Sequence, residues 1–205
     1  MPIAPVSPTS RFNSPGGFSL VELLVVVTVM ALVGASAVPM TASGLAAYRI
    51  RNDAEAVKNL VSLAKMRAAS RFTRARVYVD RAANTYRLEV FNRDTNAWDI
   101  EGATIAMSAG VNFGFGGLAD PPPNTQNVIG QSPQCTDAGG AAIANTSCIV
   151  FNSRGVPIVM PAATPIGNNA LYITNGSVVY ATTVTTTPLV RFWWTGAGAA
   201  NWVQQ

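Results

Sequence analysis

The chain has 205 residues, of which 49% are hydrophobic and only 12% are charged, and its formal net charge is +4. This length accommodates one folded domain of ordinary size and one further helix, and so apolar a composition argues against a disordered chain. Histidine is absent, which removes the commonest general base and metal ligand, so hydrolytic and metal chemistry are not expected.

The first predicted element is a long apolar helix that begins near Phe18. Between Phe18 and Met40, Glu22 is the only charged residue, and a helix of this length would cross the hydrocarbon core of a bilayer, about 30 Å thick. A carboxylate costs about 2.5–3.5 kcal/mol at the centre of a membrane helix, and less near its end, unless it has a partner. A cut between Gly17 and Phe18 would create one, because the new α-ammonium group would lie near Glu22 of the same chain or of a neighbouring copy.

Residues 1–17 precede this cut and contain four prolines but no apolar run. They therefore cannot be the hydrophobic part of an ordinary secretory signal. Gly16-Gly17 is a small, flexible pair that an endoprotease can hold in an extended conformation. The hydrophobic part lies after the cut and would be retained.

The run Gly17-Phe18-Ser19-Leu20-Val21-Glu22-Leu23-Leu24 resembles the class III signal of type IV prepilins and type II secretion pseudopilins. In that family a membrane-embedded prepilin peptidase cuts after the glycine and methylates the new N-terminal phenylalanine, and the glutamate guides assembly into a filament. The resemblance implies these roles for Gly17, Phe18 and Glu22. Pro39 lies where these proteins often carry a helix-kinking proline, since proline removes a backbone hydrogen bond and clashes with the preceding turn.

Beyond Pro39 the pattern becomes amphipathic and predicts a single helix from about residue 18 to residue 72. Its apolar face should cover a sheet and consists of Leu45, Tyr48, Val57, Leu60, Val61, Leu63, Ala64 and Ala68. The basic residues of this stretch fall largely between them. The predicted organisation is a leader at 1–17, a helix at 18–72 with 18–40 in the membrane or filament core, and a β-rich periplasmic domain at 73–205.

From Arg76 onward, alternation with a period of two predicts antiparallel strands. The predicted strands are 77–80, 86–91, 111–115, 148–151, 157–160, 170–174, 178–183 and 189–194, with a further strand near Trp98. The stretch 116–147 is rich in Gly, Pro, Asn and Ala and predicts an irregular insertion. The fold class is therefore α+β, with a long N-terminal transmembrane helix packed on a C-terminal antiparallel β-sheet domain, as in pilins.

Cys135 and Cys148 are the only cysteines, and so wide a spacing without histidine makes a poor metal site. In the oxidising periplasm a disulfide is favoured, and closing a loop of this size is worth about 3 kcal/mol. The alternative is two free, buried thiols.

No phosphate-binding loop, HExxH, CxxC or nucleophile elbow appears, so neither catalysis nor a cofactor is expected. The acidic residues of the domain are interpreted as solvated strand and turn residues, namely Asp80, Glu89, Asp94, Asp99 and Glu101. Arg154 is interpreted as solvent-facing in its turn.

The aromatic tail of the chain has two interpretations. Alternation in the last strand places Phe192 and Trp194 inward and leaves Trp193 half exposed. Alternatively these side chains, together with Trp202, form an adhesive or partner-docking patch, since large exposed aromatics often mark interfaces.

The segment Ile149–Pro157, in which Phe is followed by a short polar turn and Gly155, resembles a phrase of the GspH/FimT branch of minor pilins and pseudopilins. We therefore expect a minor pilin, held in the bacterial inner membrane with a periplasmic C-terminal domain and assembled with other pilin subunits. The first alternative is a minor pseudopilin of the type II secretion system, which the sequence does not separate from a pilus subunit.

The second alternative is a DNA-binding pilin for natural transformation, motivated by the pI of about 9.4 and the arginines. DNA-binding FimT-like proteins carry a Gly-Arg-x-Arg tail motif, whereas Arg191 is the single arginine of this tail. Packing in a filament would also hide much of the basic helix at 49–76. The sequence therefore favours a structural subunit over a nucleic-acid receptor.

Overall fold

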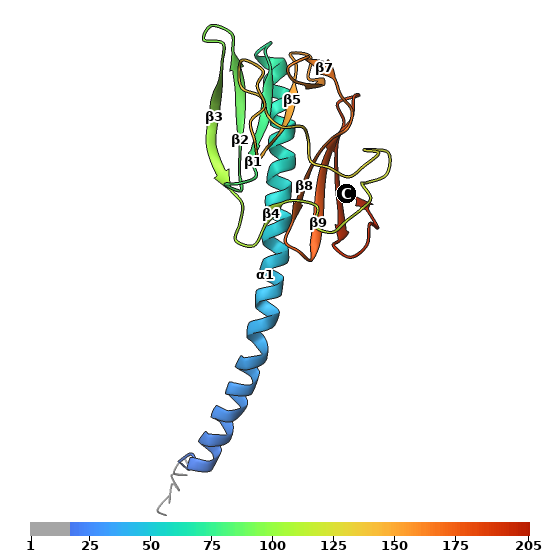
Figure 1. The fold of residues 1–205 in the computed structure, drawn as a ribbon. Coiled ribbons are helices and arrows are strands. Elements are labelled where there is room, and N and C mark those ends of the chain that lie inside the picture. Colours follow the sequence, from blue (N-terminus) through green and yellow to red (C-terminus); the bar gives the residue numbers. More distant parts are fainter. Residues whose placement is uncertain (1–16) are drawn as a thin grey trace, which may run out of the picture. The chain divides into compact units, whose positions relative to one another are not determined.

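The computed structural model describes residues 17–205, except for the side chains of residues 36–43. It divides into a first unit, Met1–Ser43, and a second unit, Gly44–Gln205, and helix α1 (Leu20–Ser70) contributes to both. The strands follow α1 along the chain (Figure 1). They are β1 (Ala75–Asp80), β2 (Thr85–Asn92), β3 (Ala97–Ala106), β4 (Asn112–Phe113), β5 (Thr146–Phe151), β6 (Pro157–Val159), β7 (Thr164–Pro165), β8 (Asn169–Thr174), β9 (Val178–Val184), β10 (Val190–Gly196) and β11 (Val203–Gln204).

The strands of the second unit form two antiparallel sheets. The first sheet has the order β3-β2-β1-β5-β6-β7, and the second has the order β11-β10-β9-β8-β4. In the first sheet, β1 pairs with β2 in a hairpin that aligns Asp80 with Thr85, and on its other side it pairs with β5. The connection between β4 and β5 thus brings the chain back from the second sheet to the centre of the first.

The C-terminal half of α1 lies between the two sheets and forms the centre of the core (Figure 1). Its buried face repeats at intervals of three and four residues, which is the helical period, and comprises Ile50, Ala54, Val57, Val61, Ala64 and Ala68. These side chains meet Val77 and Phe151 of the first sheet and Leu171 of the second. Three of them are alanines, whose small size lets the sheets approach the helix closely.

Leu45 and Tyr48 were predicted to belong to this buried face, and that prediction is wrong. They are 46% and 63% exposed, respectively, whereas Ile50 is 1% exposed. The apolar period on α1 therefore extends further towards the N-terminus than the sheets that cover it.

All the strands predicted from the sequence are present, with β3 running from the turn after β2 as far as Ala106. The two-residue strands β7 and β11 were not predicted, because two residues carry no periodicity. In the segment 116–147 the described residues contain one isolated bridge, between Thr136 and Ala142, before β5 begins at Thr146. The prediction that this segment is irregular is therefore confirmed.

The turn between β5 and β6 requires its glycine. The Asn152 side-chain oxygen accepts hydrogen bonds from the amides of Arg154 and Val156, at 2.9 and 3.0 Å. Gly155 has φ +72°, and a Cβ atom at this position would lie 3.2 Å from Cγ of Lys65 on α1. Glycine thus supplies both the left-handed backbone and the close approach to the helix, and Arg154 is exposed as predicted.

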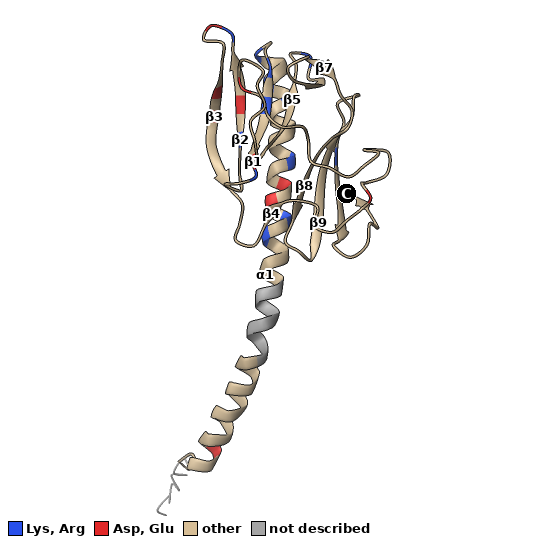
Figure 2. Cartoon of the chain, viewed as in Figure 1, with Lys and Arg blue, Asp and Glu red and all other residues tan. Residues whose placement is uncertain are grey.

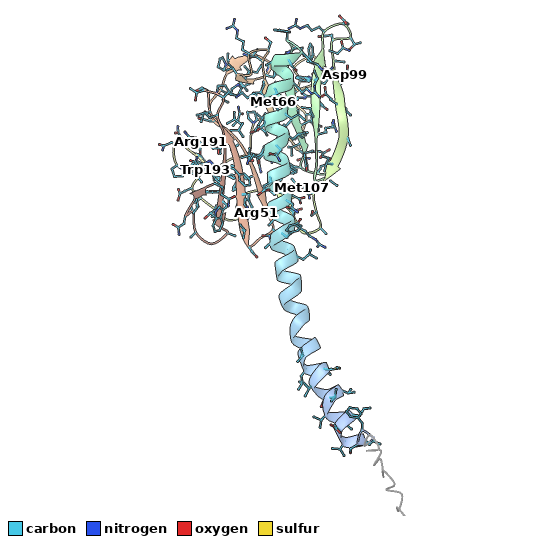
Figure 3. The ribbon with its side chains drawn as sticks, turned by 180° about the vertical axis from the view of Figure 1, so that it is seen from behind. Arg51, Met66, Asp99, Met107, Arg191 and Trp193 are labelled. Atoms are coloured by element: carbon cyan, nitrogen blue, oxygen red, sulfur yellow. A yellow bond between two sulfur atoms is a disulfide. The ribbon has the colours of Figure 1, made fainter. Side chains whose placement is uncertain are left out.

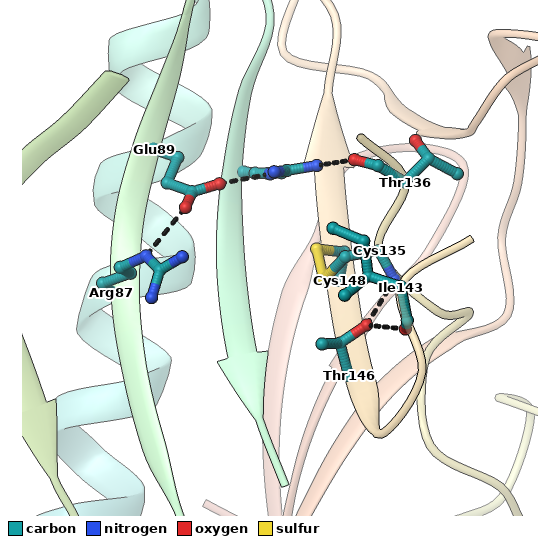
Figure 4. Close-up of a disulfide and its surroundings, with 8 residues drawn as sticks. Arg87, Glu89, Cys135, Thr136, Ile143, Thr146 and Cys148 are labelled. Carbon is teal, nitrogen blue, oxygen red and sulfur yellow. Dashed lines mark hydrogen bonds and ion pairs between the residues drawn. A yellow bond between two sulfur atoms is a disulfide. The ribbon is translucent and has the colours of Figure 1, made fainter. Parts of the chain in front are cut away.

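A disulfide joins Cys135 to Cys148 at β5, the pair expected from the sequence (Figure 4). Hydrogen bonds reinforce this link, because the Cys135 amide donates to the Thr146 hydroxyl at 3.0 Å and the Cys148 amide donates to the carbonyl of Pro133 at 2.8 Å. The cysteines pack with Tyr78 on the outer face of the first sheet. The irregular segment is thereby held across this face.

Removing the disulfide with the double variant Cys135→Ser and Cys148→Ser should loosen this segment and leave the sheets intact. The loss of stability should be about 3 kcal/mol or less, because the loop between the cysteines is short and its hydrogen bonds remain. Amide hydrogen exchange checks this, with faster exchange expected at residues 133–148 and unchanged protection in β8 and β9. Equal acceleration in both regions would contradict a local role.

Beside the disulfide, the first sheet carries a buried charge cluster (Figure 4). Glu89 and Arg76 are each 3% exposed, and the Arg76 Nε atom donates to Glu89 Oε2 at 2.6 Å. Arg87 donates to the other carboxylate oxygen at 2.7 Å, and Arg76 also donates to the carbonyl of Thr136 at 2.6 Å. The interpretation of Glu89 as a solvated residue is therefore wrong, because the loop around Thr136 covers a sheet face that would otherwise meet water.

Glu101 also differs from its interpretation as a solvated residue. It forms ion pairs with Arg67 and Arg71 near the end of α1 and is only 23% exposed at its side chain. It thereby joins β3 to the helix. Asp94 and Asp99 are exposed as expected.

Candidate functional site

The N-terminal segment is the candidate functional site, and it begins with a helix cap. The Ser19 hydroxyl accepts a hydrogen bond from the Val21 amide at 3.4 Å, and the Ser19 carbonyl accepts one from the Leu23 amide at 3.1 Å. Ser19 therefore occupies the N-cap position before Leu20, the first residue of α1. Sequence reasoning missed this role, although the spacing Ser-x-x-Glu at 19–22 is that of a capping box.

Glu22 lies in the first turn of α1. The free backbone amides there give the helix end a partial positive charge, which stabilises a carboxylate by about 0.3–1 kcal/mol. Glu22 is exposed, and in the described part of the chain its side chain has no hydrogen bond or ion pair. The acid thus stands where the helix itself favours a negative charge, without a side-chain partner.

Gly17 and Phe18 lie immediately before the helix. Phe18 is 80% exposed. A Cβ atom added to Gly17 would meet no atom within 4 Å, and its φ lies outside the left-handed region. Neither packing nor backbone conformation in the described residues requires glycine at position 17.

The side chains that follow are apolar on every side of the helix. The described large apolar residues that are at least 45% exposed here include Leu20, Val21, Leu23, Leu24, Val25, Val26, Val27, Val29, Met30 and Leu32. The hydroxyl of Thr28, in the same stretch, donates to the carbonyl of Val25 at 2.8 Å. A helix that is apolar all round is characteristic of burial in a membrane or in a bundle of helices.

Within the described residues, no helix meets the length and hydropathy required of a membrane span. The predicted span at 18–40 includes residues 36–40, whose side chains lie outside the described set. The same holds for the predicted kink at Pro39, while the leader predicted at 1–17 lies outside it except for Gly17.

The aromatic tail is built into the second sheet and does not form an exposed patch. Phe192 is 3% and Trp193 is 6% exposed, whereas Trp194 is 36% exposed. Trp193 is therefore not half exposed as predicted, and Trp194, which lies on the same face of β10 as Phe192, is not buried as a core residue. Trp193 lies on the outer face of the sheet (Figure 3), where the second core cluster, including Leu118 and Tyr172, covers it.

The described part of α1 carries both basic and acidic residues (Figure 2), and most of its basic side chains contact other residues of the chain. Arg51 pairs with Glu55 at 2.9 Å, and Arg67 pairs with Glu101. Lys65 donates to the carbonyl of Pro188 at 2.8 Å, and the Lys58 ammonium group lies 5.2 Å from the centre of the Phe192 ring. The helix therefore does not present a row of unpaired cations of the kind that phosphate contacts require.

Comparison with known proteins finds a family motif in this same N-terminal segment. Residues 13–38 match the prokaryotic N-terminal methylation motif. Among solved structures, the chain is similar to the minor pseudopilin EpsH from the Type 2 Secretion System of Vibrio cholerae, with 12% identity and a TM-score of 0.45. That alignment covers 74% of this chain and 99% of the EpsH chain. No curated protein matches the sequence.

The methylation motif contains Gly17, the exposed Phe18 and the lone acid Glu22. Prepilin-type proteins, in which this motif occurs, are structural subunits of filaments and not enzymes. Residues 13–38 thus carry the N-terminal methylation motif of prepilin-type proteins, the class formed by type IV pilins and pseudopilins.

Proposed function

We propose that the chain is a minor subunit of a type IV pilus. It is inserted in the inner membrane through the helix at 18–40, with the second unit in the periplasm. A prepilin peptidase cuts it between Gly17 and Phe18, and it then enters the filament beside other pilin subunits. The single observation that carries this proposal is the lone acid Glu22 at the start of α1, in a stretch, residues 20–33, that has no other charge and whose exposed side chains are apolar apart from Thr28.

The apolar surface at the start of α1 suits both proposed environments of the helix. Before assembly, lipid tails cover the apolar side chains, and after assembly the equivalent side chains of neighbouring subunits replace the lipid. The transfer between two apolar environments costs little hydrophobic free energy, because lipid is about as apolar as the side chains themselves. Electrostatic pairing of Glu22 with an N-terminal ammonium group is then the term that distinguishes the assembled state from the free one.

The choice between a pilus and a type II secretion pseudopilus rests on the strand-turn-strand segment Ile149–Pro157. Its turn, closed by Asn152 and Gly155 against α1, is a specific structural unit. The segment resembles a phrase of the GspH/FimT branch, which includes both groups. The resemblance to FimT-like subunits within that branch leads us to favour the pilus and to retain a minor pseudopilin as the alternative.

Nucleic-acid binding is the less favoured alternative. Arg51 and Arg67 on α1 and Arg71 just after it are paired with glutamates, and Arg76 is buried in the first sheet. The nearby glutamates offset the positive charge that phosphate contacts would use. Their placement supports a structural role for the arginines that raise the pI.

The mature N-terminus tests this function. In a host with active prepilin peptidase, mass spectrometry of the membrane-extracted protein should find a chain that begins at an N-methylated Phe18. The variant Gly17→Glu should keep residues 1–17, because no neighbouring atom in the structure opposes a side chain at position 17 and folding should be unaffected.

The matched control is Gly34→Ala, since Gly34 also has no atom near its missing Cβ. Its processing should equal that of the wild type. An intact leader on the wild-type chain, or a cut near Ala35 or Ala37 typical of ordinary signal peptidase, would refute the proposal.

A further inference from the structure

The strand β3 is an edge of the first sheet that differs from every other sheet edge in the described residues. The other edge strands, β4, β7 and β11, have two residues each, whereas β3 has ten. Very short edge strands are one means by which proteins prevent unwanted strand pairing. This protection is present at three edges and absent at the fourth.

Other protective features are also scarce on β3. Its sequence, Ala97–Ala106, contains no lysine, arginine or proline, the residues that commonly block an edge. Ile100 and Ile105 are 53% and 42% exposed. Its pairing with β2 is irregular between Tyr86 and Leu88, which leaves the five residues from Ala97 to Glu101 as a regular, open stretch.

Three side-chain contacts anchor this open stretch. Glu101 is tied to α1 by Arg67 and Arg71, and the Asn92 side chain donates to Asp99 at 2.9 Å. A concavity of about 630 Å³ lies beside it, lined by residues including Arg71, Arg93, Ile100 and Gly102. Figure 3 shows Asp99 on this outermost strand. A row of backbone groups next to a preformed concavity fits an extended peptide, whose main chain pairs with the edge while its side chains enter the hollow.

We propose that β3 accepts an added strand from a different subunit of the filament, an inference that rests on the proposed function. The added segment carries an apolar side chain against Ile100 on the outer face and a basic side chain near Asp99 on the inner face. Charge supports this choice, because Asp94 and Asp99 have no ion pair within residues 17–205.

A second copy of this chain fits the edge less well. Antiparallel pairing of two β3 strands about Ile100 would place Asp99 of each copy opposite Glu101 of the other. Like charges directly opposite one another destabilise a strand pair. Asp94 and Asp99 favour instead a segment with basic residues, which β3 itself lacks.

The test uses the full chain in cells that assemble the filament. A photoreactive p-benzoylphenylalanine replaces Ile100 in one variant and Leu189 in a control, and both positions are 53% exposed. After irradiation, cross-linked peptides in the sheared filament fraction are identified by mass spectrometry. Position 100 should cross-link to one defined segment of another subunit several-fold more than position 189.

A second pair of variants measures the consequence for assembly. Ile100→Lys should reduce incorporation into the filament several-fold, because a lysine blocks the edge, while Leu189→Lys should leave incorporation unchanged. Equal effects at both positions, or cross-links from position 100 to lipid, nucleic acid or a second copy, would overturn the strand addition. Absence of the wild-type chain from the filament would refute the proposed function and this inference together, whereas its presence without a preference for position 100 would refute this inference alone.

Discussion

Glu89→Ala should lower the free energy of unfolding by about 3–5 kcal/mol, because it leaves the Arg76 guanidinium buried without its carboxylate. Burial already lowers the pKa of Arg76 below its ordinary value, and the Glu89 carboxylate acts in the opposite direction. The remaining contacts of Arg76, with the carbonyl of Thr136 and with the Trp98 ring at 3.9 Å, do not neutralise the charge. Denaturant unfolding of the detergent-solubilised chain measures the effect.

Arg87→Ala is the matched control, because Arg87 pairs with the same carboxylate but is 23% exposed at its side chain. Its removal should cost only about 1 kcal/mol. The double variant Arg76→Met and Glu89→Leu should recover most of the lost stability, since well-packed apolar residues can replace a buried ion pair. If Glu89→Ala and Arg87→Ala were equally destabilising, the burial of Arg76 would not be the cause.

Local periodicity accounts for what the sequence predicts correctly. The buried face of α1 from Val57 to Ala68 follows the helical period, and the strands follow a period of two with turns such as Asn175-Gly176 between them. Both signals depend on which faces of an element meet the core. They therefore locate the elements well and fix their ends only to within a few residues.

Two of the errors share one physical cause, namely the covering of a second sheet face by irregular chain. Glu89 and Trp193 occupy positions that alternation assigns to solvent. The loop near Thr136 covers the first, and a cluster with Leu118 covers the second. Period-two reasoning assumes one wet face, and neither loop has a pattern in the sequence that announces where it will lie.

Long-range pairing is the other feature that sequence does not reveal. The contacts of Glu101 with Arg67 and Arg71 depend on the placement of β3 beside the end of α1. By contrast, the N-terminal site is local, so its motif can be recognised directly in residues 16–39. Even there, the N-cap role of Ser19 follows from the spacing to Glu22 and could have been predicted.

The second large effect is expected for Glu22→Gln, which should reduce incorporation into the filament about tenfold or more, since a loss of about 1.4 kcal/mol corresponds to a tenfold change. The substitution preserves size and removes the charge that would pair with the Phe18 ammonium group. Membrane insertion and cleavage should survive, because the segment becomes more apolar. Immunoblotting of sheared filaments against the membrane fraction measures the ratio.

Two controls separate the charge from other consequences of the change. Thr28→Val removes a polar group from the same apolar stretch without altering charge, and its incorporation should equal that of the wild type. The corresponding glutamate-to-glutamine variant of the major subunit, assayed in parallel, shows how far a subunit in the shaft depends on the charge. A subunit at the filament tip could tolerate the change better than one in the shaft.

The size of the effect also distinguishes pairing from helix capping. Glutamine can replace glutamate in a capping box, so a capping role alone would lose only the interaction with the helix end, about 0.3–1 kcal/mol. That loss corresponds to roughly a twofold to fivefold change in an equilibrium. A tenfold or larger defect therefore requires the ion pair with an N-terminal ammonium group, whereas wild-type incorporation of a membrane-stable Glu22→Gln chain would exclude an assembly role for this residue.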